Sequence, residues 1–263
     1  MGGPVPEKRG LLMHRFYVEE PISGPGQSIT LSKEESAHAA RVLRLRPGEE
    51  VRLLDGQNLW AAVMETVDEK ASTVRVDALC ESPEASCHAV LFQGLPKADK
   101  LEMIVQKGTE LGMSALWPVE MERSVARMDK SGRDEKKRER MQRIALEAAK
   151  QSGRACVPEI CPAMSFAKAL DIIRQQSFDL ILVAWEEEHA LPLSKAVQQY
   201  LQTKGQPQSA LIVIGPEGGI SPAEYEQLHQ LGAVSVTLGK RILRTETAGL
   251  CALSVLWAAL GEM

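Results

Sequence analysis

Aromatic side chains are scarce in this sequence: phenylalanine, tryptophan and tyrosine together make up 4% of its 263 residues. Their scarcity disfavours a nucleic-acid surface that works by stacking many unpaired bases. No run of roughly eighteen apolar residues is present, so the sequence predicts no transmembrane helix and no membrane partner. The formal net charge is −4, which by itself does not indicate a nucleic-acid-binding protein.

The cysteines argue against a metal site and against disulfides. None of the five forms a CxxC pair and no histidine has the spacing of a zinc site, so we expect no bound metal. An odd number of cysteines without a secretory signal indicates reduced thiols, and cytoplasmic is the default location. The first residues, MGGPVPEKRGLL, lack the apolar core of a signal peptide, so we expect 1–12 to be a disordered extension.

The most informative stretch spans residues 210–248, where two apolar strands each run into a glycine turn that opens a helix. ALIVI at 210–214 precedes GPEGG at 215–219, and VSVT at 234–237 precedes LGKRILRTET at 238–247. In open α/β sheets, ligands collect at the carboxyl ends of strands, where loops meet helix N-termini. Two such loops can close on one small molecule, so we place the chemistry here.

The first loop is suited to close contact with a ligand, although not with a phosphate. Its glycines let the backbone approach a bound molecule, and the segment from Ser221 to Glu224 predicts a capping box with proline at the first helical position. A tight turn without a ligand would carry the same glycines, so this loop alone leaves both interpretations open. The pattern is neither a Walker loop nor GxGxxG, and Glu217 would repel a phosphate.

The second loop is cationic. Lys240, Arg241 and Arg244 lie within five residues, and Thr245 is the expected N-cap of the helix that follows, with Glu246 at its positive end. Cations beside a glycine turn are ordinarily solvated. Here they lie where an anionic substrate would meet a pocket, which favours a functional role.

Together, GPEGGISPAE and LGKRILRTETA closely resemble the 16S ribosomal RNA uridine-N3 methyltransferases, the RsmE family of the SPOUT superfamily. Other segments carry the same resemblance, and it covers roughly residues 13–262. These segments are HRFY at 14–17, HAARVLR at 38–44, KxxxLExxxQKGTELG at 97–112, and EAAKQSGR at 147–154 with Pro158.

The resemblance implies an activity and a fold. The activity is S-adenosylmethionine (SAM)-dependent methylation of N3 of a specific uridine in 16S rRNA of the small ribosomal subunit. The fold is a C-terminal SPOUT α/β domain with a deep trefoil knot, preceded by a PUA-like RNA-binding β-barrel, in a homodimer. Periodicity alone would have favoured an unknotted Rossmann-like sheet, because knots are nearly absent from proteins.

The residue pattern divides the chain near the linker at 81–86. Short strands separated by turns are expected at 14–18, 51–54, 59–67 and 73–79, with one helix after a capping box at Ser32. From residue 87, strands alternate with helices, including helices expected at 98–111 and 134–151, which indicates a largely parallel α/β domain. We therefore expect a PUA-like domain at 13–86 and a SAM-binding methyltransferase domain at 87–263.

Local charge is more informative than net charge for RNA. Residues 122–154 hold eleven Lys or Arg against six Asp or Glu, and clustered cations supply the phosphate contacts of RNA binding. A solvated helix with i,i+4 ion pairs would give the same composition, and the residues alone do not decide between the two. With the resemblance, the candidate RNA-binding residues are Arg15, Arg41, Arg44, Arg46, Arg123, Arg127 and Arg154.

Methylation of uracil N3 needs loss of the N3 proton, either to a base or through cations that stabilise the uracil anion. We name Arg244 first and Arg241 second for the cation. Glu217 is a candidate carboxylate, although an exposed carboxylate is a weak base. The residues expected to bind SAM are Ala184, Ile214, Gly215, Pro216, Glu217, Gly218, Gly219, Leu238, Gly239, Arg241, Ile242, Leu243 and Thr247.

Two other functions fit parts of the sequence. One is a non-catalytic rRNA-binding or ribosome-assembly protein with a SAM-like pocket, against which the intact glycine loops argue. The other is a different α/β enzyme with a nucleotide cofactor, such as a dehydrogenase. The missing GxGxxG and Walker patterns disfavour the second alternative.

Overall fold

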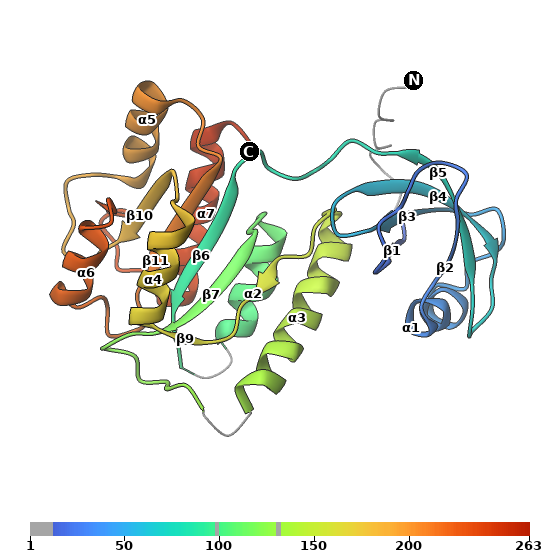
Figure 1. Cartoon of the computed structure of the whole chain (residues 1–263), viewed down its shortest axis with the longest axis horizontal. Helices are drawn as coiled ribbons and strands as arrows, with labels where there is room; N and C mark the ends of the chain where they lie inside the picture. Colours follow the sequence, from blue (N-terminus) through green and yellow to red (C-terminus); the bar gives the residue numbers. More distant parts are fainter. Residues whose placement is uncertain (1–12, 98–99, 130–132) are drawn as a thin grey trace. The chain divides into compact units, whose positions relative to one another are not determined.

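The computed structural model describes residues 13–97, 100–129 and 133–263. Two compact units make up this part of the chain (Figure 1). The first unit contains the residues up to Glu84 and also Ala149–Val157, and the second contains Ala85–Ala148 and Pro158–Met263. The disordered extension expected at 1–12 and the first two residues of the helix expected at 98–111 lie outside the described residues.

A five-stranded sheet in the order β1-β3-β4-β5-β2 forms the first unit. β1 runs parallel to β3, and the other neighbours are antiparallel. The four strands expected here are present, each within one residue of its expected ends. β2 was not expected, because three residues are too few to show an alternating pattern. The strands are β1 (Arg15–Tyr17), β2 (Ser28–Thr30), β3 (Glu50–Leu54), β4 (Leu59–Thr66) and β5 (Thr73–Leu79).

The helix expected after Ser32 is α1 (Lys33–Ala37), which continues into a π-helical segment, η1 (His38–Leu43). The Ser32 hydroxyl accepts a hydrogen bond from the Glu35 backbone N–H, as a capping box requires. The Glu35 carboxylate, however, accepts from the Lys150 ammonium at 2.9 Å instead of reaching back to the N-cap. The expected capping box is therefore only half formed, because its carboxylate binds a cation from far along the chain.

Residues 149–157 complete the first unit from beyond the linker. The Arg154 side chain is buried, and its guanidinium lies 2.6 Å from the Glu84 carboxylate. That carboxylate also accepts the Ala155 backbone N–H at 2.8 Å. Ala155 packs with Leu54 in a small buried cluster of the same unit.

A parallel seven-stranded sheet forms the second unit, in the order β12-β10-β11-β6-β7-β8, with β9 also paired to β7. The expected parallel α/β architecture is confirmed. Its strands are β6 (His88–Gly94), β7 (Ala115–Glu120), β8 (Glu159–Ile160), β9 (Met164–Ser165), β10 (Leu180–Ala184), β11 (Ser209–Ile214) and β12 (Val234–Val236). Its helices are α2 (Lys100–Glu110), α4 (Phe166–Gln176), α5 (Leu193–Lys204), α6 (Pro222–His229) and α7 (Thr245–Leu260), with most of α3 (Arg133–Ser152).

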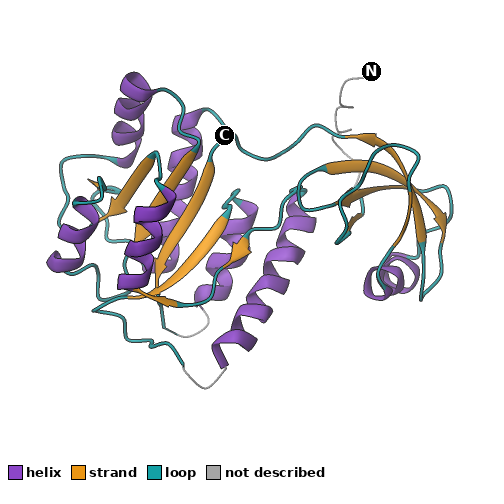
Figure 2. Cartoon of the chain, in the orientation of Figure 1, coloured by secondary structure: helices purple, strands orange, loops and turns teal. Residues whose placement is uncertain are grey.

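Helices cover this sheet (Figure 2). Successive side chains of a strand point to opposite faces of the sheet, so the strands pack against helices on both faces. Phe92 and Val213 point to one face, where they pack in a core cluster with Leu170 of α4 and Leu228 of α6. Leu91 points to the other face, where it meets Gly249 of α7. α7 packs against α2 and α5 as well as β11. No helix in the described ranges is long and apolar enough to cross a membrane.

The strand register places the carboxyl ends of β10, β11 and β12 side by side at one end of the sheet. Ala184, the last residue of β10, pairs with Ile214 of β11 on one side and with Val236 of β12 on the other. Because the three strands are parallel, the loops that follow them leave the sheet side by side. The two glycine loops are therefore neighbours in space, as the sequence predicts.

Candidate functional site

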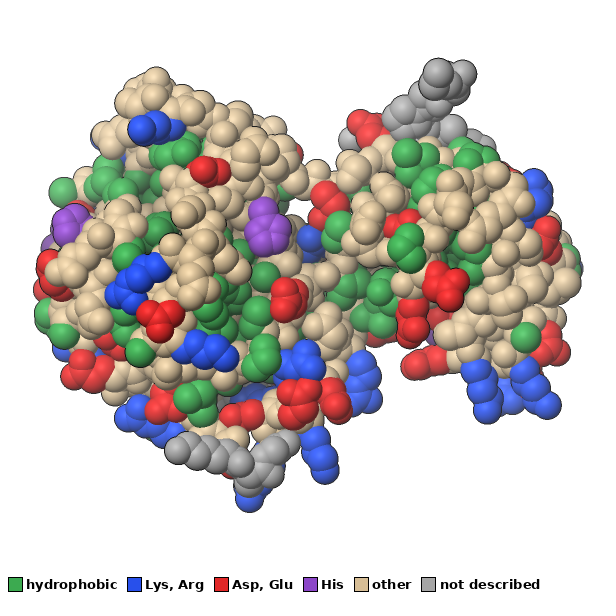
Figure 3. Space-filling view, viewed as in Figure 1, with side chains coloured by type: hydrophobic (Ala, Val, Ile, Leu, Met, Phe, Trp, Pro, Cys, Tyr) green, Lys and Arg blue, Asp and Glu red, His purple; other side chains and the backbone are tan. Residues whose placement is uncertain are grey.

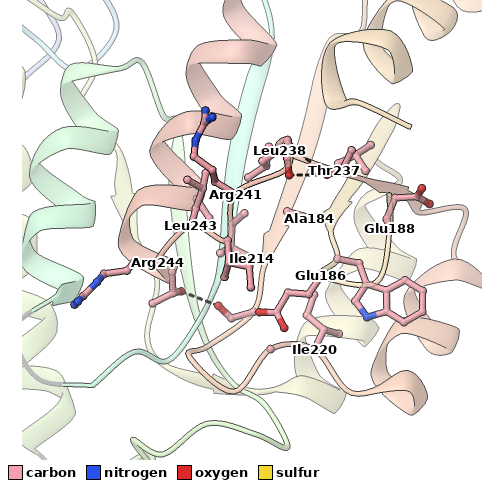
Figure 4. A pocket seen from close by; sticks show the side chains of 18 of the residues that line it. Ala184, Glu186, Glu188, Ile214, Ile220, Thr237, Leu238, Arg241, Leu243 and Arg244 are labelled. Atoms are coloured by element: carbon pink, nitrogen blue, oxygen red, sulfur yellow. Dashed lines mark hydrogen bonds between the residues drawn. The ribbon is translucent and has the colours of Figure 1, made fainter. Parts of the chain in front are cut away.

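A cavity of about 610 Å³ lies at the carboxyl ends of β10, β11 and β12 (Figure 4). Pockets for small molecules have volumes of roughly 300–1,000 Å³, so this cavity can hold a nucleoside-sized ligand. Its walls come from the segment after β10 and from both glycine loops. Of the residues expected to bind the cofactor, those lining the cavity are Ala184, Ile214, Gly215, Pro216, Glu217, Gly219, Leu238, Gly239, Arg241, Ile242 and Leu243.

Two of the expected cofactor residues do not line the cavity. A Cβ atom at Gly218 would lie 2.8 Å from the Cβ and carbonyl oxygen of Arg123, so Gly218 lets the segment after β7 approach the loop from outside. Thr247 is exposed on the first turn of α7. Ala248, the next residue, does line the cavity.

The start of α7 differs from the sequence prediction. Arg244 occupies the N-cap position, so the assignment of Thr245 as the N-cap is wrong by one residue. The buried Thr245 hydroxyl donates to the Gly215 carbonyl oxygen at 2.7 Å and accepts from Gln93 Nε2 at 2.8 Å. The hydroxyl therefore joins the two glycine loops to the end of β6 instead of capping its own helix.

An ion-pair cluster fastens the same loops from another side. The Lys100 ammonium, on α2, lies 2.9 Å from Glu217 Oε1 and 3.1 Å from Glu246 Oε2. The Lys97 backbone N–H also donates to Glu217, at 3.1 Å. The sequence did not indicate Lys100, which stands at an unspecified position of the KxxxLExxxQKGTELG segment.

The two carboxylates of this cluster are poor proton acceptors. Burial alone would raise the pKa of Glu217, but hydrogen bonds from the Lys100 ammonium and from backbone N–H groups outweigh it, so the pKa is lowered. The pKa of Glu246 is lowered in the same way: burial opposes, and backbone N–H groups and Lys100 prevail. Both groups remain charged at neutral pH and hold the loops together.

The two arginines expected at the catalytic centre lie at the rim. Arg241 and Arg244 are exposed, and in Figure 4 their guanidinium groups extend away from Ile214 at the middle of the cavity. They line the cavity through the loop ahead of α7. A guanidinium at the mouth of a pocket can meet an anionic ligand that enters from solvent.

The segment after β10 supplies a wall that the sequence did not indicate. Trp185 lines the cavity and stacks on Tyr225, with ring centroids 3.8 Å apart, and Tyr225 in turn stacks on His229. Glu188 accepts hydrogen bonds from the Ala190 N–H at 2.7 Å and from the Ser235 hydroxyl at 2.7 Å, which fixes the segment beside β12. Trp185 followed by three glutamates forms no recognised motif. Only the folded structure shows that this segment lines the cavity.

Residues 83–257 match the RNA methyltransferase domain family, and residues 31–77 match the RNA methyltransferase PUA domain family. Over 250 residues, the chain is 38% identical to ribosomal RNA small subunit methyltransferase E of Bacillus subtilis (strain 168), an alignment that covers 93% of this chain and 96% of that protein. The chain belongs to the ribosomal RNA small subunit methyltransferase E family. The resemblance seen in the sequence is confirmed.

Two solved structures similar to this chain contain SAM. The ribosomal RNA small subunit methyltransferase E of Neisseria gonorrhoeae, bound to SAM, matches with a TM-score of 0.78 and 29% identity over 94% of this chain and 97% of that chain. A Legionella pneumophila protein in complex with SAM matches with a TM-score of 0.78 and 31% identity over 95% of this chain and 98% of that chain. Within the described residues of this family member, no group of three His, Cys, Asp or Glu side chains could hold a metal ion.

The candidate RNA-binding arginines of the first unit differ in their exposure. Arg44 and Arg46 are exposed beside η1, and Arg41 is exposed but paired with Glu69. Arg15 is half-buried. Arg154 is 6% exposed and bound by Glu84, so its guanidinium has little surface to offer RNA in this family member.

In the second unit, Arg123 and Arg127 are exposed after β7. Arg123 donates to the Gly218 carbonyl at 3.4 Å, and Arg127 pairs with Glu120 at 3.1 Å. Along α3, Arg138 pairs with Glu135. Lys and Arg side chains lie next to Asp and Glu on the face shown in Figure 3. The sequence left two alternatives for residues 122–154, cations that contact RNA and a solvated helix with ion pairs. The structure has both exposed cations and intrahelical ion pairs in this segment.

Proposed function

We propose that this protein transfers the methyl group of SAM to N3 of a specific uridine in the 16S rRNA of the small ribosomal subunit. The observation that carries the proposal is the cavity between the two glycine loops, in a member of a family with a SAM-bound solved structure. The loops are held in place by Thr245 and Lys100.

The residues of the cavity fit SAM. Ile214, Leu238 and Leu243 offer apolar contact for an adenine ring. Gly219 and Gly239, at φ +75° and +111°, adopt backbone conformations that favour glycine and bring main-chain groups to the surface of the cavity. When bound, SAM supplies an electrophilic methyl group on a sulfonium. The protein contributes chiefly by holding that group in line with the acceptor nitrogen.

The acceptor nitrogen must lose its proton before or during transfer. We propose that Arg244, with Arg241 second, stabilises the negative charge that then spreads over the uracil oxygens. The N3–methyl bond forms as the carbon–sulfur bond breaks, the sulfur keeps the bonding electrons, and the N3 proton passes to solvent or to an unidentified base. Glu217 is disfavoured as that base, because its lowered pKa makes it a weak proton acceptor.

The first unit has a PUA domain match, which supports a role in rRNA binding. We propose that Arg41, Arg44 and Arg46 contact phosphates there, and that Arg123 and Arg127 do so on the second unit. Such contacts position an RNA but carry no sequence information. Arg154 is left out of this surface because it is bound to Glu84.

Three finer features belong to the same proposal: a deep trefoil knot in the second unit, a homodimer, and a cytoplasmic location. The knot is proposed only from the resemblance to the SPOUT superfamily. Sedimentation equilibrium would test the homodimer, and fractionation of cells would test the location.

The decisive experiment combines binding and transfer. We expect calorimetry to show SAM binding, and methyl-labelled SAM to label undermethylated small ribosomal subunits, with the label recovered as N3-methyluridine from 16S rRNA. SAM binding with label in a different nucleoside would contradict the proposed acceptor. Absence of SAM binding would remove the enzymatic proposal and leave an rRNA-binding protein.

A further inference from the structure

Among the described residues, three glutamates line the cavity: Glu186, Glu188 and Glu217. Two of them are engaged by the protein itself. Glu217 is bound by the Lys100 ammonium at 2.9 Å, and Glu188 accepts two backbone N–H groups and the Ser235 hydroxyl. Neither carboxylate is available to a ligand without breaking interactions that hold the cavity wall.

Glu186 is different. Within the part of the chain that the structure describes, its exposed carboxylate makes no hydrogen bond and no ion pair. In this structure it lies close to Gly219: a Cβ atom built on Gly219 would lie 2.7 Å from Glu186 Oε2. The carboxylate therefore lies over the GPEGG loop, in space that only a glycine leaves open. Figure 4 shows Glu186 beside Ile220, on the wall that follows β10.

The cations of the cavity do not neutralise Glu186. Lys100 is committed to Glu217 and Glu246, and Arg241 and Arg244 extend away from the middle of the cavity (Figure 4). Lys240 also lines the cavity, and within the described residues it forms no ion pair with Glu186. A carboxylate without a partner at the wall of a pocket is stabilised when a ligand brings a positive charge. SAM carries two such charges, the sulfonium and the ammonium of its amino-acid portion.

We propose that Glu186 is a cofactor-specificity residue that pairs with a positively charged group of SAM. The inference rests on the proposed function and identifies the residue that selects the charge of the cofactor. If the partner is the sulfonium, the same carboxylate favours release of the product, because S-adenosylhomocysteine has lost that charge. If the partner is the ammonium, Glu186 selects the amino-acid portion instead.

Calorimetry with three probes shows whether Glu186 pairs with the sulfonium or with the ammonium. SAM has both charges, S-adenosylhomocysteine has the ammonium alone, and methylthioadenosine has neither. We expect Glu186→Gln to weaken SAM binding by about threefold to fivefold, as for an ion pair open to solvent. Weaker SAM binding alone assigns the sulfonium, and equally weaker SAM and S-adenosylhomocysteine binding assigns the ammonium. Methylthioadenosine binding stays unchanged in both cases.

Glu187→Gln is the matched control, because Glu187 is the neighbouring exposed glutamate and does not line the cavity. Unchanged binding of all three probes to Glu186→Gln would overturn the inference. So would an equal loss for all three, methylthioadenosine included, because that would show a role in the shape of the wall. If the unaltered protein binds none of the probes, the proposed function itself has failed. This result is distinct from failure of the Glu186 inference, which appears only as a difference between variants.

Discussion

The Thr245 hydroxyl and the Gly215 carbonyl oxygen are joined by a hydrogen bond of 2.7 Å across 30 residues of sequence. The same hydroxyl accepts from Gln93 Nε2, so one oxygen atom links the end of β6, the first glycine loop and the start of α7. This buried hydroxyl therefore helps to fix the relative position of the two loops.

Replacing Thr245 with valine should therefore loosen the cavity. Valine keeps the shape but removes the hydrogen bond to the Gly215 carbonyl and one of the two hydrogen bonds of the Gln93 amide, a loss of about 1–3 kcal/mol in the free energy of unfolding. We expect a lower Tm and weaker SAM binding, measured by calorimetry. Thr245→Ser, which retains the hydroxyl, should stay closer to the unaltered protein. Equal behaviour of serine and valine would show that the hydroxyl is unimportant.

Lys100 should act on the loops through its two carboxylate partners. Lys100→Met removes the charge, leaves Glu217 and Glu246 to repel each other, and should weaken SAM binding several-fold, whereas Lys100→Arg should retain most of it. A double-mutant cycle with Glu217→Gln measures the coupling. Additive effects of the two substitutions would mean that the ion pair does not hold the loop.

The pH dependence of methylation should not follow Glu217. Because its pKa is lowered, its stabilising effect is complete above the ordinary carboxyl pKa and disappears only as pH falls through the lowered value. We expect the rate to rise with pH in the neutral and alkaline range as the uracil proton leaves, in Glu217→Gln as in the unaltered enzyme. A large fall in the single-turnover rate of Glu217→Gln across the whole pH range, with SAM binding unchanged, would instead identify Glu217 as the base.

Gly219 should tolerate no side chain. Alanine there would adopt an unfavourable φ of +75°, and its Cβ atom would also displace the flexible Glu186 carboxylate, whose Oε2 lies 2.7 Å away. We expect Gly219→Ala to lose at least about tenfold in SAM affinity, since a backbone shift of the loop costs on the order of 1–3 kcal/mol. Gly232→Ala provides the comparison, because Gly232 has a similar φ of +86° with open space around it. A similar loss in both variants would point to general strain.

Charge reversal at Arg127 tests the RNA surface. Arg127→Glu should weaken binding of small-subunit rRNA fragments and reduce the slope of log affinity against log salt by about one for each phosphate that is no longer neutralised. Arg174→Glu is matched to it, since Arg174 is also exposed and paired with a carboxylate, Asp171 of α4. SAM affinity should be unchanged in both. An equal effect of the two reversals on RNA would mean that only net charge matters.

Residues 210–248 were predictable because their signals are local. Apolar runs ending in glycine turns mark strand ends, and Ser221 with Glu224 forms the expected capping box in full. Parallel pairing then brings the two loops together without further information. Most of the expected cofactor residues accordingly line one cavity.

Interactions between distant residues were not predictable. Lys100 meets Glu246 because α2 packs on α7, and the Thr245 hydroxyl donates to the Gly215 carbonyl instead of capping its own helix. Arg154 was grouped with the RNA-binding cations because its neighbours in sequence are basic, whereas the fold binds it to Glu84. The sequence shows which residues are charged, but contacts in the folded protein decide which of those charges remain available to bind RNA.

The pairing of Arg154 with Glu84 has a consequence for how this protein can be divided. Residues 85–148 belong to the second unit, and they separate the two sequence segments that form the first unit, as an insertion would. A gene fragment that stops at the linker encodes Glu35 and Glu84 without the cations that neutralise them, and without Ala155 in the cluster around Leu54. The RNA methyltransferase PUA unit of this chain is therefore not a module that recombination could transfer by a single cut.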